Sequence, residues 1–287
     1  MGHRRRYGLI VMTTLSLGLI SALCFGLSDF MNGVATKRSS AWPVAVLACF
    51  GATVIIVIAA CFTQGQTVAA DYAWSALSGI GNGMGTMFLY RGLARGRMGV
   101  VAPVSAVGAA LFPVAVGVLS GEQPGLNVWL AILCGLPGIW LVSRTPESAD
   151  TRPSGLNDAI LAGVGFGLMF VGLGKVPEGH GLWPAAFAEL VATFSLVIAA
   201  LATKNSPTPR RPSEWTGLLG GVLAGFAVIG FTLAAQSGLL TVTAVLTSLY
   251  PAVTVVLAAL VLRETIHRAQ AAGLALCAAT VVLIALA

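Results

Sequence analysis

Charged residues are scarce in this 287-residue chain. Only 9% of its residues are Asp, Glu, Lys or Arg, whereas 57% are hydrophobic. A water-soluble domain carries about 25% charged residues, so this chain has too little charge to cover a surface that faces water. Its mean hydropathy of +0.90 agrees with that conclusion. The composition excludes a soluble domain and predicts an integral membrane protein.

Histidine and cysteine are also scarce, and neither is grouped as catalytic or metal sites require. Metal hydrolysis needs clustered ligands, and nucleophilic catalysis needs a nucleophile, a histidine and an acid close together. No CxxC pair exists, and the histidines fall in the N-terminal tail or in loops. We therefore predict no enzyme activity, no metal site and no cofactor. The histidines are His3, His180 and His267; the cysteines, which we interpret as small buried hydrophobic residues, are Cys24, Cys49, Cys61, Cys134 and Cys277.

The net charge of +6 comes from short clusters of charged residues between apolar runs. That arrangement is typical of Lys and Arg flanking membrane spans. A nucleic-acid interface would need a basic stripe, and a nucleotide site would need a phosphate-binding loop; the sequence has neither. We expect the lipid bilayer and a small-molecule substrate as partners, with no nucleic acid and no nucleotide, and leave the oligomeric state open.

The chain repeats itself after about half its length. Residues Trp42-Pro43-Val44-Ala45 return as Trp183-Pro184-Ala185-Ala186, an offset of 184 − 43 = 141. Residues Phe25-Gly26-Leu27 return at the same offset as Phe166-Gly167-Leu168. The sequence therefore contains one apolar module of about 140 residues in two copies, and paired halves of a membrane protein usually enclose a binding site.

Ten apolar runs approach the length of about 20 residues that a helix needs to cross a bilayer. They lie at residues 9–31, 42–62, 73–93, 100–120, 127–143, 158–174, 182–203, 215–235, 241–262 and 269–287. Five spans per half is an odd number, so the second half must enter the membrane from the opposite side. The predicted fold class is an all-α integral membrane protein of about ten transmembrane helices, built from two inverted five-helix repeats.

The polar stretch in the middle of the chain divides these repeats. We place the first five-helix repeat at residues 1–143, a polar linker at 144–157 and the second repeat at 158–287.

Several short motifs recur in a fixed order. Leu249-Tyr250-Pro251-Ala252-Val253 is followed by Glu264, thirteen residues after the proline, and then by Gly273. Gly121-Glu122 is a weaker copy in the first half, and Leu89-Tyr90-Arg91-Gly92-Leu93 ends the third span. In this order, over nearly the whole chain, the motifs resemble the EamA-type branch of the drug/metabolite transporter superfamily.

That resemblance implies a secondary transporter that moves a small metabolite or drug-like solute by alternating access, in the export direction. We expect it in a bacterial inner membrane as a multi-pass protein. The alternative is a non-transporting membrane scaffold or sensor, although the loops are too short to form a signalling domain.

Glu189 is the acid closest to the middle of a predicted span, about four residues or roughly 6 Å away. No Lys or Arg lies within one helical turn of it. An ionisable group at that depth is costly and is usually functional, so we interpret Glu189 as a substrate or proton ligand. The alternative is a carboxyl that reaches the interface or bonds a Ser or Thr of a neighbouring helix.

Asp29 lies about six residues past the middle of the first predicted span, roughly 9 Å at the rise of a helix. It is a second candidate for proton or substrate-amine binding in a central cavity. The alternative is an interfacial residue that pairs with Lys37 or Arg38 in the adjoining turn.

Four uncharged polar residues at comparable depth are further candidates for substrate binding: Asn82, Ser105, Thr247 and Tyr250. An amide both donates and accepts hydrogen bonds, which suits a polar metabolite. Each of these groups could instead bond a neighbouring helix or its own helix backbone.

Other residues have expected structural roles. Glu122 and Glu264 recur at helix ends in both halves, so we expect them to cap helices or to form pairs at the short turns, with Arg263 or Arg268 nearby. We expect Pro113 and Pro251 to kink their spans. Four glycines recur at spacings that favour close helix packing: Gly79, Gly83, Gly221 and Gly225.

Overall fold

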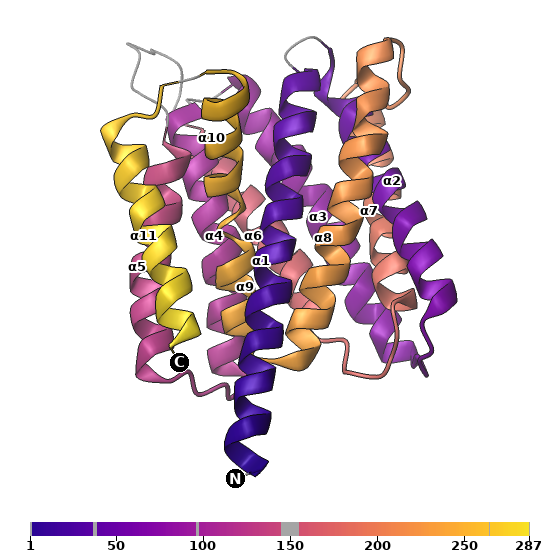
Figure 1. Ribbon diagram of the computed structural model, residues 1–287. Coiled ribbons are helices and arrows are strands. Elements are labelled where there is room, and N and C mark those ends of the chain that lie inside the picture. The colour runs from indigo at the N-terminus through magenta and orange to yellow at the C-terminus, as the bar shows by residue number, and fades with distance from the viewer. Residues whose placement is uncertain (1, 37–38, 96–97, 145–154, 264, 287) are drawn as a thin grey trace.

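The computed structural model describes residues 2–36, 39–95, 98–144, 155–263 and 265–286, and all regular structure within those ranges is helical (Figure 1). The helices are α1 (Gly2–Thr36), α2 (Ala41–Phe62), α3 (Ala69–Arg95), α4 (Met98–Leu119), α5 (Leu126–Ser143), α6 (Leu156–Gly174), α7 (Trp183–Ala202), the short 3₁₀ helix η1 (Pro212–Trp215), α8 (Thr216–Ser237), α9 (Leu240–Thr247), α10 (Tyr250–Val261) and α11 (Arg268–Ala285).

Nine helical segments in the described ranges are long and apolar enough to cross a membrane, and α9 and α10 together form one of them. The 27-residue α3 has the length but is less apolar, since glycine, serine and an asparagine interrupt its hydrophobic residues. It packs against α6 and α7 inside the bundle and completes a set of ten. The predicted all-helical membrane fold is confirmed.

The packing of the helices shows the two halves and their inversion. Helix α3 packs against α6 and α7 of the second half, and its counterpart α8 packs against α1 and α2 of the first. Likewise α4 contacts α6, while α9 and α10 contact α1. The start of α1 and the end of α11 lie at the same end of the bundle (Figure 1), as an even number of crossings requires. We call this the terminal end and the opposite one the linker end.

The predicted linker at 144–157 lies largely outside the described residues. Helix α5 ends at Ser143 and α6 begins at Leu156.

Glycines bring the helices of the two halves into backbone contact. A Cβ atom added at Gly79 of α3 would overlap the carbonyl oxygen of Ala188 in α7, and one added at Gly221 of α8 would overlap the carbonyl oxygen of Ala48 in α2. Those two contacts occupy equivalent places in the repeat. Gly83 faces Ser195 of α7, and Gly225 faces Ala52 and Ile55 of α2, in the same way. Because lipid supplies no hydrophobic drive between helices, close approach of this kind supplies much of the attraction.

Glu122 joins the halves at the terminal end. It lies in the turn between α4 and α5, and its carboxylate accepts the backbone N–H groups of Leu240 at 2.7 Å and Thr241 at 3.0 Å. These N–H groups belong to the first turn of α9, where no partner exists within the helix. Glu122 therefore caps a helix of the other half. Arg263 and Arg268 follow α10 at the linker end, far from it.

Glu264, the expected counterpart of Glu122 in the second half, lies outside the described residues.

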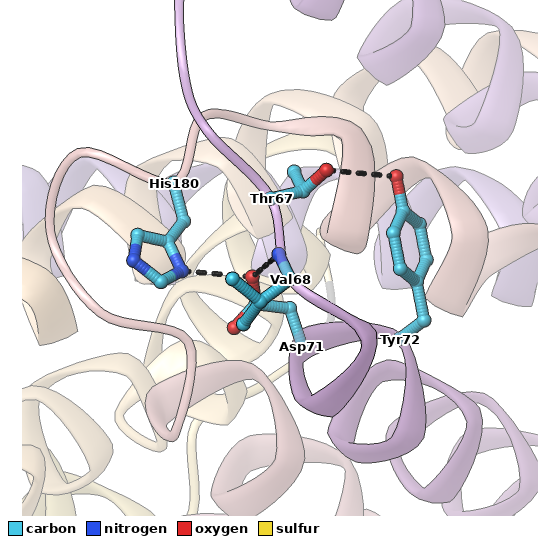
Figure 2. Close-up of polar contacts among 5 residues, drawn as sticks. All are labelled: Thr67, Val68, Asp71, Tyr72 and His180. Carbon is cyan, nitrogen blue, oxygen red and sulfur yellow. Dashed lines mark hydrogen bonds and ion pairs between the residues drawn. The ribbon is translucent and has the colours of Figure 1, made fainter.

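A second polar contact joins the loops at the terminal end. The buried Asp71, in the first turn of α3, accepts the Val68 N–H at 2.8 Å and lies 2.7 Å from Nδ1 of His180 (Figure 2). Beside it, the hydroxyls of Thr67 and Tyr72 lie 3.3 Å apart. Because His180 belongs to the loop between α6 and α7, this contact ties the α2–α3 loop to the second half.

Glu122→Ala removes the acceptor for two N–H groups of α9. We expect it to destabilise the protein by about 1–2 kcal/mol, the usual cost of losing a helix cap. The measurement is thermal unfolding of the purified protein in detergent. Gln123→Ala removes the exposed side chain next to Glu122, so it is the control and should change little. Equal melting temperatures for the two variants would refute the capping role.

Gly221→Ala places a methyl group against the backbone of α2, so one of the two helices must shift. We expect a loss of about 1–3 kcal/mol, the usual cost of overpacking. In contrast, a Cβ at Gly33 of α1 meets nothing within 4 Å, so Gly33→Ala should be neutral or stabilising by about 0.5–1 kcal/mol because alanine favours the helix. Thermal unfolding of both variants tests this; a Gly221→Ala protein as stable as the wild type would contradict it.

Candidate functional site

The ninth span is broken in the middle of the membrane. Helix α9 ends at Thr247 and α10 begins at Tyr250, with Ser248 and Leu249 between them. Pro251 accounts for the break, because proline has no N–H to donate to the carbonyl of Thr247 four residues earlier. A broken helix is tolerated at this depth only where the freed groups are buried in protein or face a cavity.

The other predicted kink behaves differently. Helix α4 runs from Met98 to Leu119 without interruption, even though it contains both Pro103 and Pro113. The two halves thus differ at the equivalent span, and only the second half has an interrupted helix there.

Glu189 of α7 lies where three helices meet. Its side chain is buried, with 3% of its surface exposed. The Asn82 amide of α3 donates to its carboxylate at 3.4 Å, and the same amide nitrogen lies 4.0 Å from the sulfur of Cys49 in α2. Among the described residues, no Lys or Arg forms an ion pair with Glu189. The contact crosses the boundary between the halves, since α2 and α3 belong to one and α7 to the other.

Asp29 of α1 is exposed although its face of the helix turns toward the protein. Ala22, two turns earlier on that face, is only 2% exposed. Ile20 and Leu23 are 48% and 50% exposed. At 100° per residue, Ile20 lies about 180° around the helix from Asp29, and Leu23 lies about 120° from it. They form the lipid-facing side. Asp29 is therefore exposed on a side of α1 other than the one that carries Ile20 and Leu23.

Tyr90 of α3 and Tyr250 of α10 are both near enough to Asp29 for their hydroxyls to interact electrostatically with its carboxylate. Tyr90 interacts in the same way with Cys49. We call Asp29, Cys49, Asn82, Tyr90, Glu189 and Tyr250 the central polar cluster.

Aromatic rings border the Asp29 end of this cluster. The Phe25 and Tyr250 rings lie 6.3 Å apart, and Tyr90 makes an edge-on contact with Trp42 at 6.3 Å. Arg91, next to Tyr90, is directed elsewhere: its Nε donates to Asp158 of α6 at 3.0 Å. The basic side chain closest in sequence to Tyr90 is thus already paired with an acid outside the cluster.

No contact described for Ser105 or Thr247 joins either residue to the cluster. The hydroxyl of Ser105 is buried and donates to the carbonyl of Ala102 at 3.0 Å, which is the self-bonding alternative. Thr247 is fully buried, and its hydroxyl has no hydrogen-bond partner in the described structure. Four of the six candidates are therefore brought together, namely Asp29, Asn82, Glu189 and Tyr250.

Sequence reasoning missed Cys49 and Tyr90. Cys49 was interpreted as a small hydrophobic residue, and Tyr90 was noted only within a family motif. Asn82 lies eight residues before Tyr90 on α3, and Cys49 and Tyr90 face the same interior as Asn82. Nothing in the sequence sets the rotation of α2 and α3 relative to α7, so the sequence could not place these residues together.

The two pockets described for this structure lie elsewhere. Two pockets of about 240 and 230 Å³ lie at opposite ends of the bundle, between loops of both halves, and neither contains Asp29 or Glu189. Within the described residues, no three His, Cys, Asp or Glu side chains come together as metal ligands. The central polar cluster is the candidate site because of its chemistry and its position between the halves.

The Asn82–Glu189 contact should appear as an energetic coupling. Asn82→Ala leaves a buried carboxyl without its donor, so we expect a loss of about 1–3 kcal/mol. Combining it with Glu189→Ala in a double-mutant cycle should give a coupling of about 1 kcal/mol. As a control, Asn82→Ala and Glu122→Ala should be additive within about 0.5 kcal/mol because they are distant. A coupling indistinguishable from that control would disprove the contact.

Comparison with known proteins gives the family. The EamA-like transporter family matches residues 12–144 and again residues 154–286, once in each half. A crystal structure of another protein superposes with a TM-score of 0.74, covering 95% of this chain and 96% of that one at 14% identity, which shows a shared fold. No curated protein sequence matches the chain. Because the family matches both halves and nearly the whole length, this protein belongs to the EamA-like transporter family.

Proposed function

We propose that this protein is a secondary carrier that exports a small organic solute by alternating access, in exchange for protons, across a bacterial inner membrane. The two inverted halves rock about the central polar cluster, which opens to one side of the membrane at a time. The observation that carries the proposal is the buried Glu189, which meets Asn82 of the other half without a described cationic partner.

The position of Glu189 favours a proton site. A carboxylate at membrane depth costs several kcal/mol unless it is paired or hydrated, and such groups usually mark ion or substrate pathways. A proton can neutralise it when it is shielded, and water can take the proton away when the site opens. The Asn82 amide holds the carboxyl group in place in either state, because its N–H donates to a carboxyl oxygen that remains an acceptor after protonation.

The broken ninth span favours a moving element. Helix α10 contains no fully buried residue, and its first turn contacts α1 at Gly26, where a Cβ would lie 2.8 Å from the Tyr250 carbonyl oxygen. Movement about the break at Ser248 and Leu249 would change the distance between Tyr250 and Asp29. Discontinuous helices at the bilayer midplane are the usual binding elements of secondary transporters.

Glu189→Gln tests the proton role. Glutamine keeps the size and an acceptor oxygen but has no exchangeable acidic proton. In proteoliposomes screened with amino acids, nucleosides and cationic drugs, we expect solute flux driven by a pH gradient to fall at least tenfold, while exchange of solute for solute persists.

Glu178→Gln, which removes an exposed acid in the α6–α7 loop, is the matched control and should transport as the wild type does. Full pH dependence in Glu189→Gln would remove Glu189 from this role. Absence of flux for every solute, in correctly folded protein, would instead favour the non-transporting scaffold or sensor.

A further inference from the structure

We infer that the transported solute is a monovalent organic cation, an amine or quaternary ammonium group, whose charged nitrogen binds at Asp29 between Tyr90 and Tyr250. This inference rests on the proposed carrier function and adds the chemical class of its substrate. It draws on three features of the Asp29 end of the central polar cluster: its charge, its aromatic border and the exposed face of α1 beside it.

The charge of this region favours a cation. Asp29 is exposed on a protein-facing side of α1, so a solute can reach it. No ion pair among the described residues neutralises it, and Arg91 is held by Asp158. Glu189, the second acid of the cluster, is buried. The two carboxylates would repel an anionic solute and attract a cationic one.

Lys37 and Arg38, the alternative partners of Asp29, lie outside the described residues.

The aromatic border suits an organic cation more than a metal ion. Phe25 lies one turn before Asp29 on the same face, and its ring lies 6.3 Å from that of Tyr250. Tyr90 of α3 interacts electrostatically with Asp29, and its ring makes an edge-on contact with that of Trp42. Ring faces attract ammonium groups, and each such contact contributes about 0.5–2 kcal/mol, while their edges accommodate apolar substituents of the solute.

The same face of α1 is also exposed one turn beyond the acid. Gly33 is one turn after Asp29 on the same face; it is exposed, and an added Cβ would meet nothing within 4 Å. Phe25, Asp29 and Gly33 therefore lie on one face of α1. Phe25 contributes an aromatic ring, Asp29 a negative charge, and Gly33 a position without a side chain. Farther down this face, at Gly18 and Ala22, the helix is buried, so the open region ends there and faces the linker end.

Binding to purified protein in lipid nanodiscs tests the inference without requiring transport. The probes are radiolabelled tetramethylammonium, phenyltrimethylammonium and tetraphenylphosphonium. We expect saturable binding of at least one, with tert-butylbenzene, the neutral isostere of phenyltrimethylammonium, and benzenesulfonate competing at least tenfold more weakly than the unlabelled cation.

Variants then test whether the cation binds at the Asp29 carboxylate. Asp29→Asn should weaken cation binding at least tenfold, Asp29→Glu should remain within a fewfold of the wild type, and Tyr250→Leu should weaken it about three- to tenfold through the lost ring. Glu178→Gln is the control for removal of an acid outside the cluster. Thermal unfolding and size-exclusion chromatography establish that each variant is folded.

The inference is overturned if none of the three cations binds, if folded Asp29→Asn binds within twofold of the wild type, or if benzenesulfonate competes as well as the cation. Its failure can be told apart from failure of the carrier proposal. Flux of a neutral or anionic solute without cation binding overturns this inference alone. Cation binding at Asp29 without flux of any solute overturns the carrier proposal alone.

Discussion

Backbone contact between helices of opposite halves is the constraint on which the rest of this structure depends. In lipid, two helices gain nothing from burying apolar surface that lipid already covers, so they associate by close packing. The glycines at 79, 83, 221 and 225 remove the side chains that would keep α3 from α7 and α8 from α2. The symmetry of these contacts follows from the duplication, because each copy brings the same small residues to the other.

This close packing determines where polar groups can survive. Away from the interface between the halves, an ionisable side chain in a span would face lipid. At the interface, Glu189 finds an amide donor on α3, and Asp29 finds tyrosines on α3 and α10. Helix α3, which contributes Gly79 and Gly83 to this packing, also supplies Asn82 and Tyr90 to the candidate site.

The two halves are alike in packing and different in chemistry. Their equivalent helices make equivalent contacts, but the acids of the cluster have no acidic counterparts in the repeat: Phe170 stands where Asp29 would recur, and Ala48 where Glu189 would. The break at Pro251 likewise has no equivalent in α4. The packing of the helices is thus symmetric, whereas each acid of the candidate site occurs in only one of the two copies.

The sequence by itself determined that the protein resides in a membrane, that its chain is duplicated and how many spans it has. It also determined the positions of the glycines and of the two intramembrane acids. These depend on composition and on spacing along one chain, which a membrane makes strict because every span must satisfy its own backbone. Only the tertiary structure decided that Glu122 caps α9 of the other half, that Ser105 bonds its own helix, and that Cys49 and Tyr90 join the site. The contacts between helices depend on the rotation and depth of segments that lie more than a hundred residues apart in the sequence. Interhelical packing fixes that rotation and depth, and helical periodicity does not specify them.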